Sequence, residues 1–155
     1  MTPRIYIDTS VFGGYFDVEF AAYTIPLFNR IANGDFFMLY SEITEEELEN
    51  APIKVKNLVQ GLRISQTEFL KVTGETIDLA TEYIAAGVVG ETSYVDCLHI
   101  ALATIHHADF LVSWNFKHIV NVDRIRGYNS INIKNGYKSL DIRSPRAFGN
   151  YEDNN

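Results

Sequence analysis

The chain has 155 residues, of which 46% are hydrophobic and 21% are charged. This length and composition are typical of a soluble globular protein with one domain. The single cysteine, Cys97, excludes an internal disulfide bond. No run approaches the roughly 20 apolar residues of a membrane span, and the N-terminal residues lack a secretory signal pattern. We therefore expect a cytoplasmic protein without membrane contact, whose net charge of −7 argues against a simple nucleic-acid binder.

The hydrophobic pattern predicts strands and helices that alternate along the chain. Strands are expected at residues 5–7, 36–40, 69–72, 110–112 and 140–142. Helices are expected at residues 19–33, 44–50, 52–62, 73–86, 93–107 and 117–128, with a turn or short helical piece at 11–14 and a loop at 129–137. This alternation predicts an α/β fold, a three-layer α/β/α sandwich with a central parallel sheet. Residues 1–148 would form one domain and residues 149–155 a polar tail.

Polar side chains gather where the predicted strands end. The clusters are, in chain order, Asp8-Thr9-Ser10, residues 41–47 and Ser113-Trp114-Asn115. Asp96 lies about one turn into the helix that precedes the fourth strand. Because open parallel sheets bind ligands at the carboxyl ends of their strands, we expect these side chains to converge on one edge of the sheet.

The acidic members of these clusters, Asp8, Glu47 and Asp96, are candidate metal ligands. Mg²⁺ and Mn²⁺ prefer oxygen ligands, and a metal beside a phosphate can activate a bound water as a nucleophile. Each acid also has a structural alternative. Asp8 could cap a helix, Glu47 fits a capping box that starts at Thr44, and Asp96 fits a looser box that starts at Ser93.

The four histidines form no convincing zinc pattern, because His106 and His107 are adjacent and only one cysteine is present. His99 lies one turn after Asp96 on the same side of the predicted helix. We interpret His99 as a structural helix histidine, and a functional role is the alternative.

Four motifs in order carry a resemblance to a known family. They occupy residues 7–10, 41–48, 96–103 and 111–115. Together they resemble the motifs of the PIN domain, and within it those of the VapC-type toxins of prokaryotic toxin–antitoxin pairs. The resemblance extends over about residues 4–145. It implies a parallel sheet between helices, in agreement with the hydrophobic pattern.

The resemblance also implies an activity, that of a Mg²⁺- or Mn²⁺-dependent endoribonuclease that hydrolyses RNA phosphodiester bonds. It implies that the metal ligands are Asp8, Glu47 and Asp96, and that Thr9 or Ser10 and Ser113 bind metal waters or phosphate. At the fourth acidic position of the family this chain has Asn115. An amide carries no charge, so we expect one complete metal site rather than two, with Asn115 also able to orient the substrate.

A basic C-terminal third is expected to contact RNA, since seven basic and two acidic residues lie between residues 117 and 146. Lys117, Arg124 and Arg126 are the predicted RNA contacts. The alternatives are a solvated surface or a site for an acidic segment of an antitoxin. A homodimer could form through the apolar face of residues 20–31.

Two other readings remain beside the nuclease. A catalytically weakened PIN-like module that binds RNA or a protein partner would explain Asn115 and the overall acidity. A phosphoacceptor receiver domain also places acids after its first strand, but no clear lysine follows the last strand here. A dinucleotide-binding fold would need a Gly-x-Gly-x-x-Gly turn, which the sequence does not contain.

Overall fold

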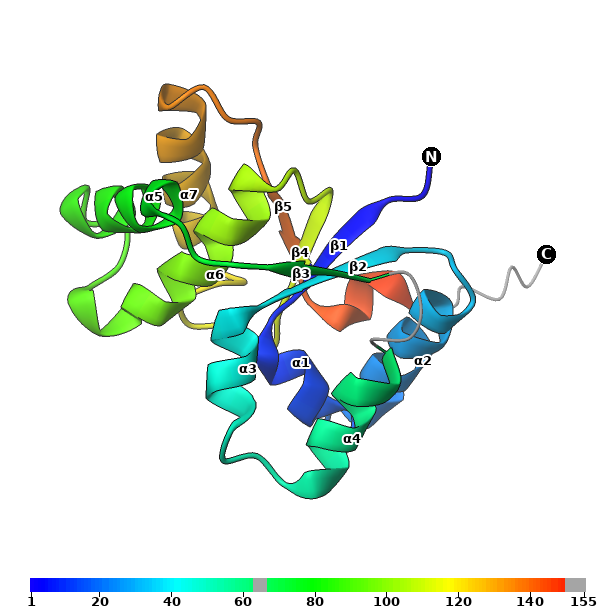
Figure 1. The fold of residues 1–155 in the computed structure, drawn as a ribbon. Helices are drawn as coiled ribbons and strands as arrows, with labels where there is room; N and C mark the ends of the chain where they lie inside the picture. The colour runs from blue at the N-terminus through cyan, green and yellow to red at the C-terminus, as the bar shows by residue number, and fades with distance from the viewer. Residues whose placement is uncertain (63–66, 150–155) are drawn as a thin grey trace.

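The computed structural model describes residues 1–62 and 67–149, and in these ranges the chain folds around a five-stranded sheet (Figure 1). The strands are β1 (Arg4–Ile7), β2 (Phe37–Ser41), β3 (Thr67–Leu70), β4 (Phe110–Val112) and β5 (Asp141–Arg143). Their order across the sheet is β3-β2-β1-β4-β5, and every pairing is parallel. The first strand is therefore the central one of the five.

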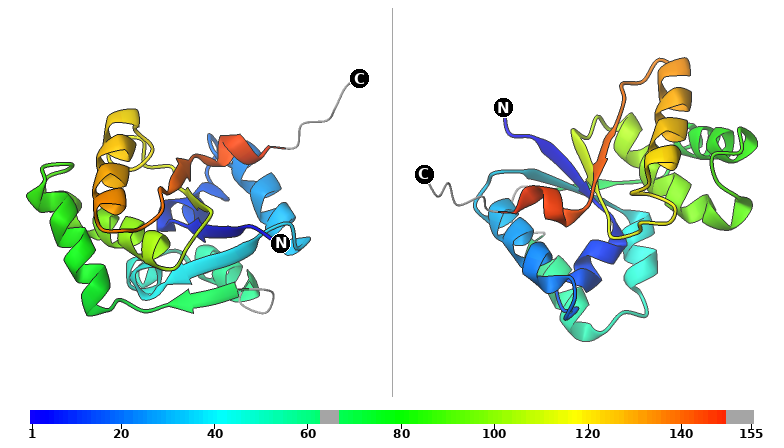
Figure 2. Two further views of the ribbon diagram at one scale, coloured as in Figure 1. Left: turned by 90° about the horizontal axis from the view of Figure 1, so that it is seen from above. Right: turned by 180° about the vertical axis from the view of Figure 1, so that it is seen from behind.

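Helices cover both faces of the sheet, as Figures 1 and 2 show. One face packs against α5 (Gly74–Ala85), α6 (Tyr94–Ile105) and α7 (Val122–Lys134). The other packs against α1 (Thr9–Gly14), α2 (Ala21–Ala32) and α4 (Ile53–Leu62). Helix α3 (Glu42–Leu48) follows β2 directly, and two short 3₁₀ turns, η1 (Glu91–Ser93) and η2 (Pro145–Phe148), complete the described elements. This arrangement confirms the predicted three-layer α/β/α sandwich.

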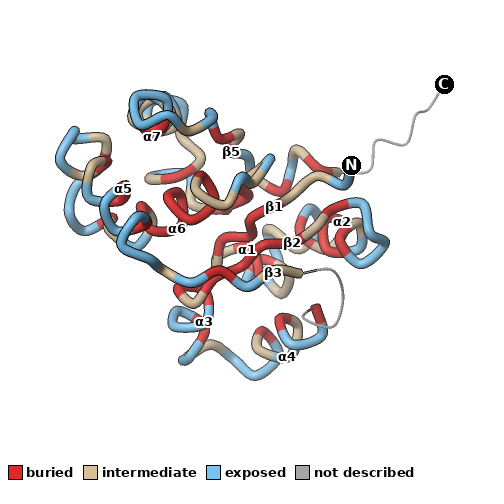
Figure 3. Tube along the Cα trace, turned by 45° about the horizontal axis from the view of Figure 1, so that its top comes forward, coloured by how far each residue is buried: buried red, intermediate tan, exposed pale blue. Residues whose placement is uncertain are grey.

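Alternation along β1 divides the core in two. Tyr6 points into the core beneath α5, α6 and α7, whereas Ile5 and Ile7 point into the core beneath α1, α2 and α4. All three side chains are fully buried, and the buried residues run through the centre of the molecule in Figure 3. Strand β1 is thus fixed on both faces, which holds the residue that follows it, Asp8, in a defined position.

Each predicted strand overlaps an observed one, although β3 (Thr67–Leu70) begins and ends two residues before the predicted range of 69–72. Among the helices, the one predicted at 117–128 is the most misplaced. Helix α7 begins at Val122, not at residue 117, and it continues to Lys134, which lies within the predicted loop of residues 129–137. Asparagines are frequent in loops, but those of this segment make tertiary contacts within the fold. Buried Asn132 accepts a hydrogen bond from the hydroxyl of Tyr83 and donates one to Thr104 Oγ1 at 3.2 Å. Intrinsic helix propensity predicts secondary structure poorly where a side chain makes buried tertiary contacts.

The predicted start of the acidic helix was also wrong. Helix α3 starts at Glu42, and its N-cap is Ser41, whose Oγ accepts a hydrogen bond from the Thr44 amide at 3.4 Å. Glu47 therefore lies in the last turn of α3 and cannot be the acidic partner of an N-terminal capping box. The side chain of Glu47 is left to make contacts outside its own helix.

No helix within the described ranges is both long and apolar enough to cross a membrane. Of the predicted polar tail at residues 149–155, only Gly149 lies within the described part of the chain. The apolar side chains of α2, which the sequence offered as a dimer interface, point largely inward, with Leu27, Phe28 and Ile31 in the core.

Candidate functional site at the carboxyl edge of the sheet

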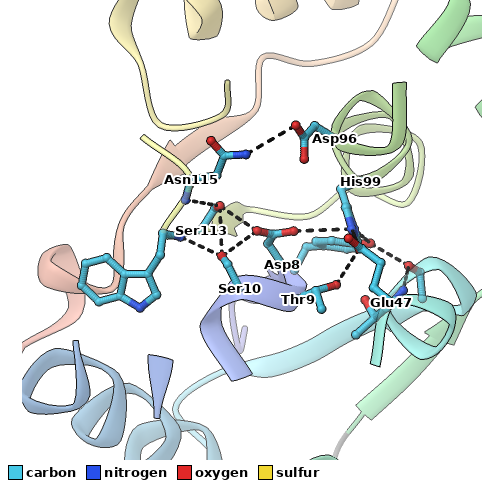
Figure 4. Close-up of polar contacts among 12 residues, drawn as sticks. Asp8, Thr9, Ser10, Glu47, Asp96, His99, Ser113 and Asn115 are labelled. Atoms are coloured by element: carbon cyan, nitrogen blue, oxygen red, sulfur yellow. Dashed lines mark hydrogen bonds and ion pairs between the residues drawn. The ribbon is translucent and has the colours of Figure 1, made fainter. Parts of the chain in front are cut away.

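The predicted polar clusters converge at the carboxyl edge of the three central strands (Figure 4). Asp8 follows β1, Glu47 extends from the helix after β2, and Ser113 follows β4. Helix α6 brings Asp96 and His99 to the same edge. This confirms the expectation that residues far apart in sequence meet here, and the parallel order β2-β1-β4 is what brings them together.

Two serine hydroxyls hold Asp8 in a single orientation. Ser10 Oγ and Ser113 Oγ each donate a hydrogen bond of 2.7 Å to Asp8 Oδ2. The serine oxygens in turn accept backbone amides, that of Trp114 at Ser10 (3.0 Å) and that of Asn115 at Ser113 (2.9 Å). Because the donors engage Oδ2, the other oxygen of this nearly buried carboxylate, Oδ1, faces His99. Ser10 and Ser113, predicted to contact substrate, are thus engaged in orienting Asp8.

His99 joins the two acids, a contact that the sequence interpretation missed. Its Nε2 lies 2.5 Å from Glu47 Oε1 and 3.4 Å from Asp8 Oδ1. Its Nδ1 is hydrogen-bonded to the Tyr6 hydroxyl at 2.6 Å. The side chain is fully buried, so the interpretation of His99 as a structural helix histidine is correct in part. The same ring, however, also lines the acidic cluster.

The electrostatics of the cluster follow from these contacts. Burial lowers the pKa of His99, but the charges of Asp8, Glu47 and Asp96 outweigh it, so the pKa is raised overall. Burial raises the pKa of Glu47. The hydrogen bond and the charge of His99, together with the hydrogen bond from the Thr9 hydroxyl, outweigh burial, so the pKa of Glu47 is lowered overall. Thr9 Oγ1 donates to Glu47 Oε1 at 2.8 Å. An imidazolium between two carboxylates is the arrangement that these shifts favour.

Asp96 lies beside this cluster and interacts with Asn115. Asn115 Nδ2 lies 3.4 Å from Asp96 Oδ2, at the long end of hydrogen-bond distances. Partial burial and then the charge of Asp8 raise the pKa of Asp96. The amide oxygen of Asn115 accepts the backbone N–H groups of Lys117 (3.2 Å) and His118 (3.0 Å). The oxygen is therefore engaged within its own loop, and the nitrogen of the amide is the atom turned toward Asp96.

The side chains that could hold a metal differ by one residue from the predicted set. Ligand atoms of Asp8, Glu47 and His99 all lie within 4.8 Å of one another. The prediction named Asp8, Glu47 and Asp96. The structure brings the first two together as expected and adds His99, whereas Asp96 stands next to this group.

The capping alternatives do not explain the acids. Asp8 occupies the N-cap position of α1, but within the described residues its side chain makes no capping hydrogen bond. Likewise, Ser93 at the start of α6 caps no amide through its side chain in the described chain, so the looser box with Asp96 does not form. The carboxyl groups of Asp8, Glu47 and Asp96 are therefore not engaged in helix capping. They are held by the side chains around them, which are Ser10, Ser113, Thr9, His99 and Asn115.

The predicted RNA contacts are placed differently from one another. Lys117 and Arg126 are exposed, the former two residues beyond Asn115 and the latter on α7. Arg124 donates a hydrogen bond to the carbonyl of Val88, which ties α7 to the loop before α6. Arg124 thus makes a structural contact that could not be predicted from its position in the sequence.

Comparison with solved structures places this fold among known ones. The chain superposes on a chain of VapBC2 from Rickettsia felis, solved bound to a DNA fragment from their promoter, with a TM-score of 0.56 and 14% sequence identity. The match covers 91% of this chain and 98% of that chain. No protein-family model and no curated protein matches the sequence. The predicted resemblance to VapC-type PIN domains is confirmed for the fold.

Proposed function

We propose that this protein is a metal-dependent endoribonuclease and the toxin of a toxin–antitoxin pair. The observation that carries the proposal is the meeting of Asp8, Glu47 and His99 ligand atoms within 4.8 Å at the carboxyl edge of the sheet. The fold of a VapBC2 chain favours the toxin role over a receiver domain. Residues 1–148 would act as one PIN-like domain located in the cytoplasm.

The side chains present fit a divalent cation. Two carboxylate oxygens and one imidazole nitrogen lie within 4.8 Å of one another, and the other nitrogen of His99 is hydrogen-bonded to Tyr6, as the second nitrogen of metal-binding histidines commonly is to a neighbouring group. Carboxylates suit Mg²⁺ and Mn²⁺, and imidazole shifts the preference toward transition metals. Between the two predicted ions, this donor set favours Mn²⁺. Asp96 would add a third carboxylate from the adjacent position.

Such an ion would stabilise charge on a phosphate and supply an activated water. The chain's own residues would do the rest. Ser10 and Ser113 hold Asp8 with one oxygen turned to the centre, and Thr9 holds Glu47. Asp96, a carboxylate beside this cluster, would accept a proton from the attacking water.

RNA is the proposed substrate and a cognate antitoxin the proposed partner. The exposed cations Lys117, two residues beyond Asn115, and Arg126 on α7 would contact the RNA. The crystallised neighbour is a VapBC pair, which supports a partner for this chain as well. A homodimer remains part of the proposal. A weakened module that only binds RNA or protein is the second candidate, and the engagement of the Asn115 oxygen by its own loop favours it.

Removal of divalent metal tests the proposal. We expect end-labelled RNA to be cut in Mn²⁺ or Mg²⁺, leaving 5′-phosphate ends, and to stay intact in EDTA until metal is restored. Calorimetric titration with Mn²⁺ should show binding to the wild-type chain. Cleavage that continues in EDTA would overturn the metal assignment, and an absence of both Mn²⁺ binding and cleavage would favour the binding module.

The substitution Asn115→Asp tests whether Asn115 lies close enough to Asp96 and the proposed metal to affect the stability of the site. We expect it to lower the free energy of unfolding in EDTA by about 1–3 kcal/mol, because a donor facing Asp96 becomes a second negative charge. The loss should shrink in Mn²⁺, which would neutralise the added charge. Urea unfolding in both conditions measures this. The matched control is Asn121→Asp, which makes the same change of charge at a residue that also caps backbone amides; equal losses in EDTA and Mn²⁺ for Asn115→Asp would contradict the prediction.

A further inference from the structure

A group of aromatic side chains adjoins the acidic cluster. Trp114 lies between two residues of the site, Ser113 and Asn115, and its indole is nearly buried. Phe20 stacks on the indole, with ring centroids 4.1 Å apart and planes 23° apart. Trp114 Nε1 donates to Thr24 Oγ1 at 3.0 Å, so the ring is held in place on α2. The indole is therefore held rigidly at the carboxyl end of β4.

Two exposed rings contact this indole. Phe116 is 44% exposed and Tyr23 is 41% exposed, and each meets the indole edge-on, with centroids 5.9 and 6.4 Å from it. Among the aromatic residues that the structure describes, only three are exposed, and these are two of them. Exposed rings concentrated at one functional edge are more informative than exposed rings scattered over a surface. We call Tyr23, Trp114 and Phe116 the aromatic patch.

A cation lies against the aromatic patch. The guanidinium carbon of Arg146 is 5.2 Å from the ring centroid of Tyr23 and 6.0 Å from that of Trp114. Arg146 extends from η2, which lies beside α2 (Figures 1 and 2). Within residues 1–62 and 67–149 it forms no ion pair, unlike Arg4, Arg30 and Arg143, each of which is paired with an acid. Its positive charge is therefore available in a protein that is acidic overall.

The path from the acidic cluster to the patch is short and rigid. Phe116 directly follows Asn115, whose side-chain oxygen accepts the amides of Lys117 and His118 and so fixes the turn that presents the Phe116 ring. Ser113, three residues earlier, donates to Asp8. A nucleotide next to a phosphate at Asp8 would thus be within reach of the patch.

We propose that Phe116, with Tyr23 and Arg146, forms a base-stacking subsite that holds an unpaired RNA base next to the phosphate bound at the acidic cluster. This inference rests on the proposed function and states how the RNA substrate would be bound. Rigid exposed rings stack on bases of any sequence, and a nearby guanidinium adds attraction for the base face and the adjoining phosphate. Arg146 supplies the charge complementarity that distinguishes a polyanion from an apolar peptide as the occupant. Only an unstacked base can use such rings, so the subsite selects single strands and loops.

The test compares two ligands of equal charge in EDTA, where binding is measured without cleavage. One is a short labelled oligoadenylate, and the other is its abasic analogue of the same length. We expect the oligoadenylate to bind about tenfold or more tightly than the analogue, and to quench the emission of Trp114, which is the only tryptophan in the sequence. Equal binding of the two ligands would overturn the proposal.

Variants then locate the effect. Phe116→Ala and Phe116→Leu are each expected to weaken oligoadenylate binding about tenfold and to leave the abasic analogue unaffected, whereas Phe116→Tyr keeps the affinity. Ile133→Ala, which truncates an exposed side chain far along α7, is the matched control and should bind as the wild type does. Wild-type affinity in Phe116→Leu would overturn base stacking and assign the patch to apolar contact with a protein partner. Tyr23→Ala provides an independent variant on another element.

The outcome separates this inference from the proposed function. Base-dependent binding that persists in EDTA, in a wild-type chain that cleaves no RNA with any metal, would overturn the nuclease and retain the subsite. Metal-dependent cleavage by the wild-type chain, with unchanged affinity of Phe116→Ala and Tyr23→Ala for the oligoadenylate, would retain the nuclease and overturn the subsite.

Discussion

Asparagine in place of Asp8 is expected to reduce the rate of RNA cleavage by about a thousandfold or more while the fold stays intact. Asp8→Asn keeps the size of the side chain and leaves one oxygen to accept the hydroxyls of Ser10 and Ser113. It removes the negative charge from the centre shared with Glu47 and His99. Metal ions provide several kcal/mol of transition-state stabilisation, and about 1.4 kcal/mol corresponds to a tenfold change in rate.

The measurement is single-turnover cleavage of labelled RNA in Mn²⁺, with the melting temperature as the check on folding. Asp78→Asn is the matched control, because it makes the same chemical change at an exposed acid on α5. Wild-type cleavage is expected for this control. Cleavage by Asp8→Asn within a few-fold of the wild-type rate would remove Asp8 from the catalytic centre and with it the basis of the proposed function.

The layers of the fold and the edge that bears the site could be predicted because they depend on local pattern. Buried runs such as Ile5 to Ile7 mark strands, and helices between them dictate parallel pairing and a common carboxyl edge. The first polar residue after the central strand then has to lie at that edge. Asp8 was placed correctly for this reason.

The details that the sequence did not yield are those decided by contacts across the fold. Asn132 looked like a loop residue, and its buried bonds to Tyr83 and Thr104 keep it in a helix. His99 looked like a core residue, because nothing in its own helix indicates that Tyr6 and Glu47 lie on either side of its ring. Its position three residues after Asp96 was the one available signal. Orientation of side chains, rather than their location at the edge, was the part that could not be read.

Removal of the His99 ring should be the most destabilising single change at the site. His99→Ala is expected to lower the free energy of unfolding by about 2–4 kcal/mol in EDTA, since it opens a cavity in a fully buried position and leaves the Tyr6 hydroxyl without its 2.6 Å partner. It also removes the imidazole that lies between Asp8 and Glu47, so the two carboxylates would repel each other more strongly. Urea unfolding of the wild type and the variant gives the difference directly.

Metal binding by the same variant distinguishes a ligand from a purely structural residue. If His99 helps to hold the ion, calorimetric titration should show a loss of Mn²⁺ affinity of about 10- to 100-fold in His99→Ala. His107→Asn, at an exposed left-handed position that asparagine tolerates, is the histidine control and should change neither quantity. A stability loss with unchanged Mn²⁺ affinity would restrict His99 to supporting Tyr6, and the proposed centre would then consist of carboxylates alone. Tighter Mn²⁺ binding by His99→Ala would instead identify the ring as a cation that an arriving metal displaces from between Asp8 and Glu47.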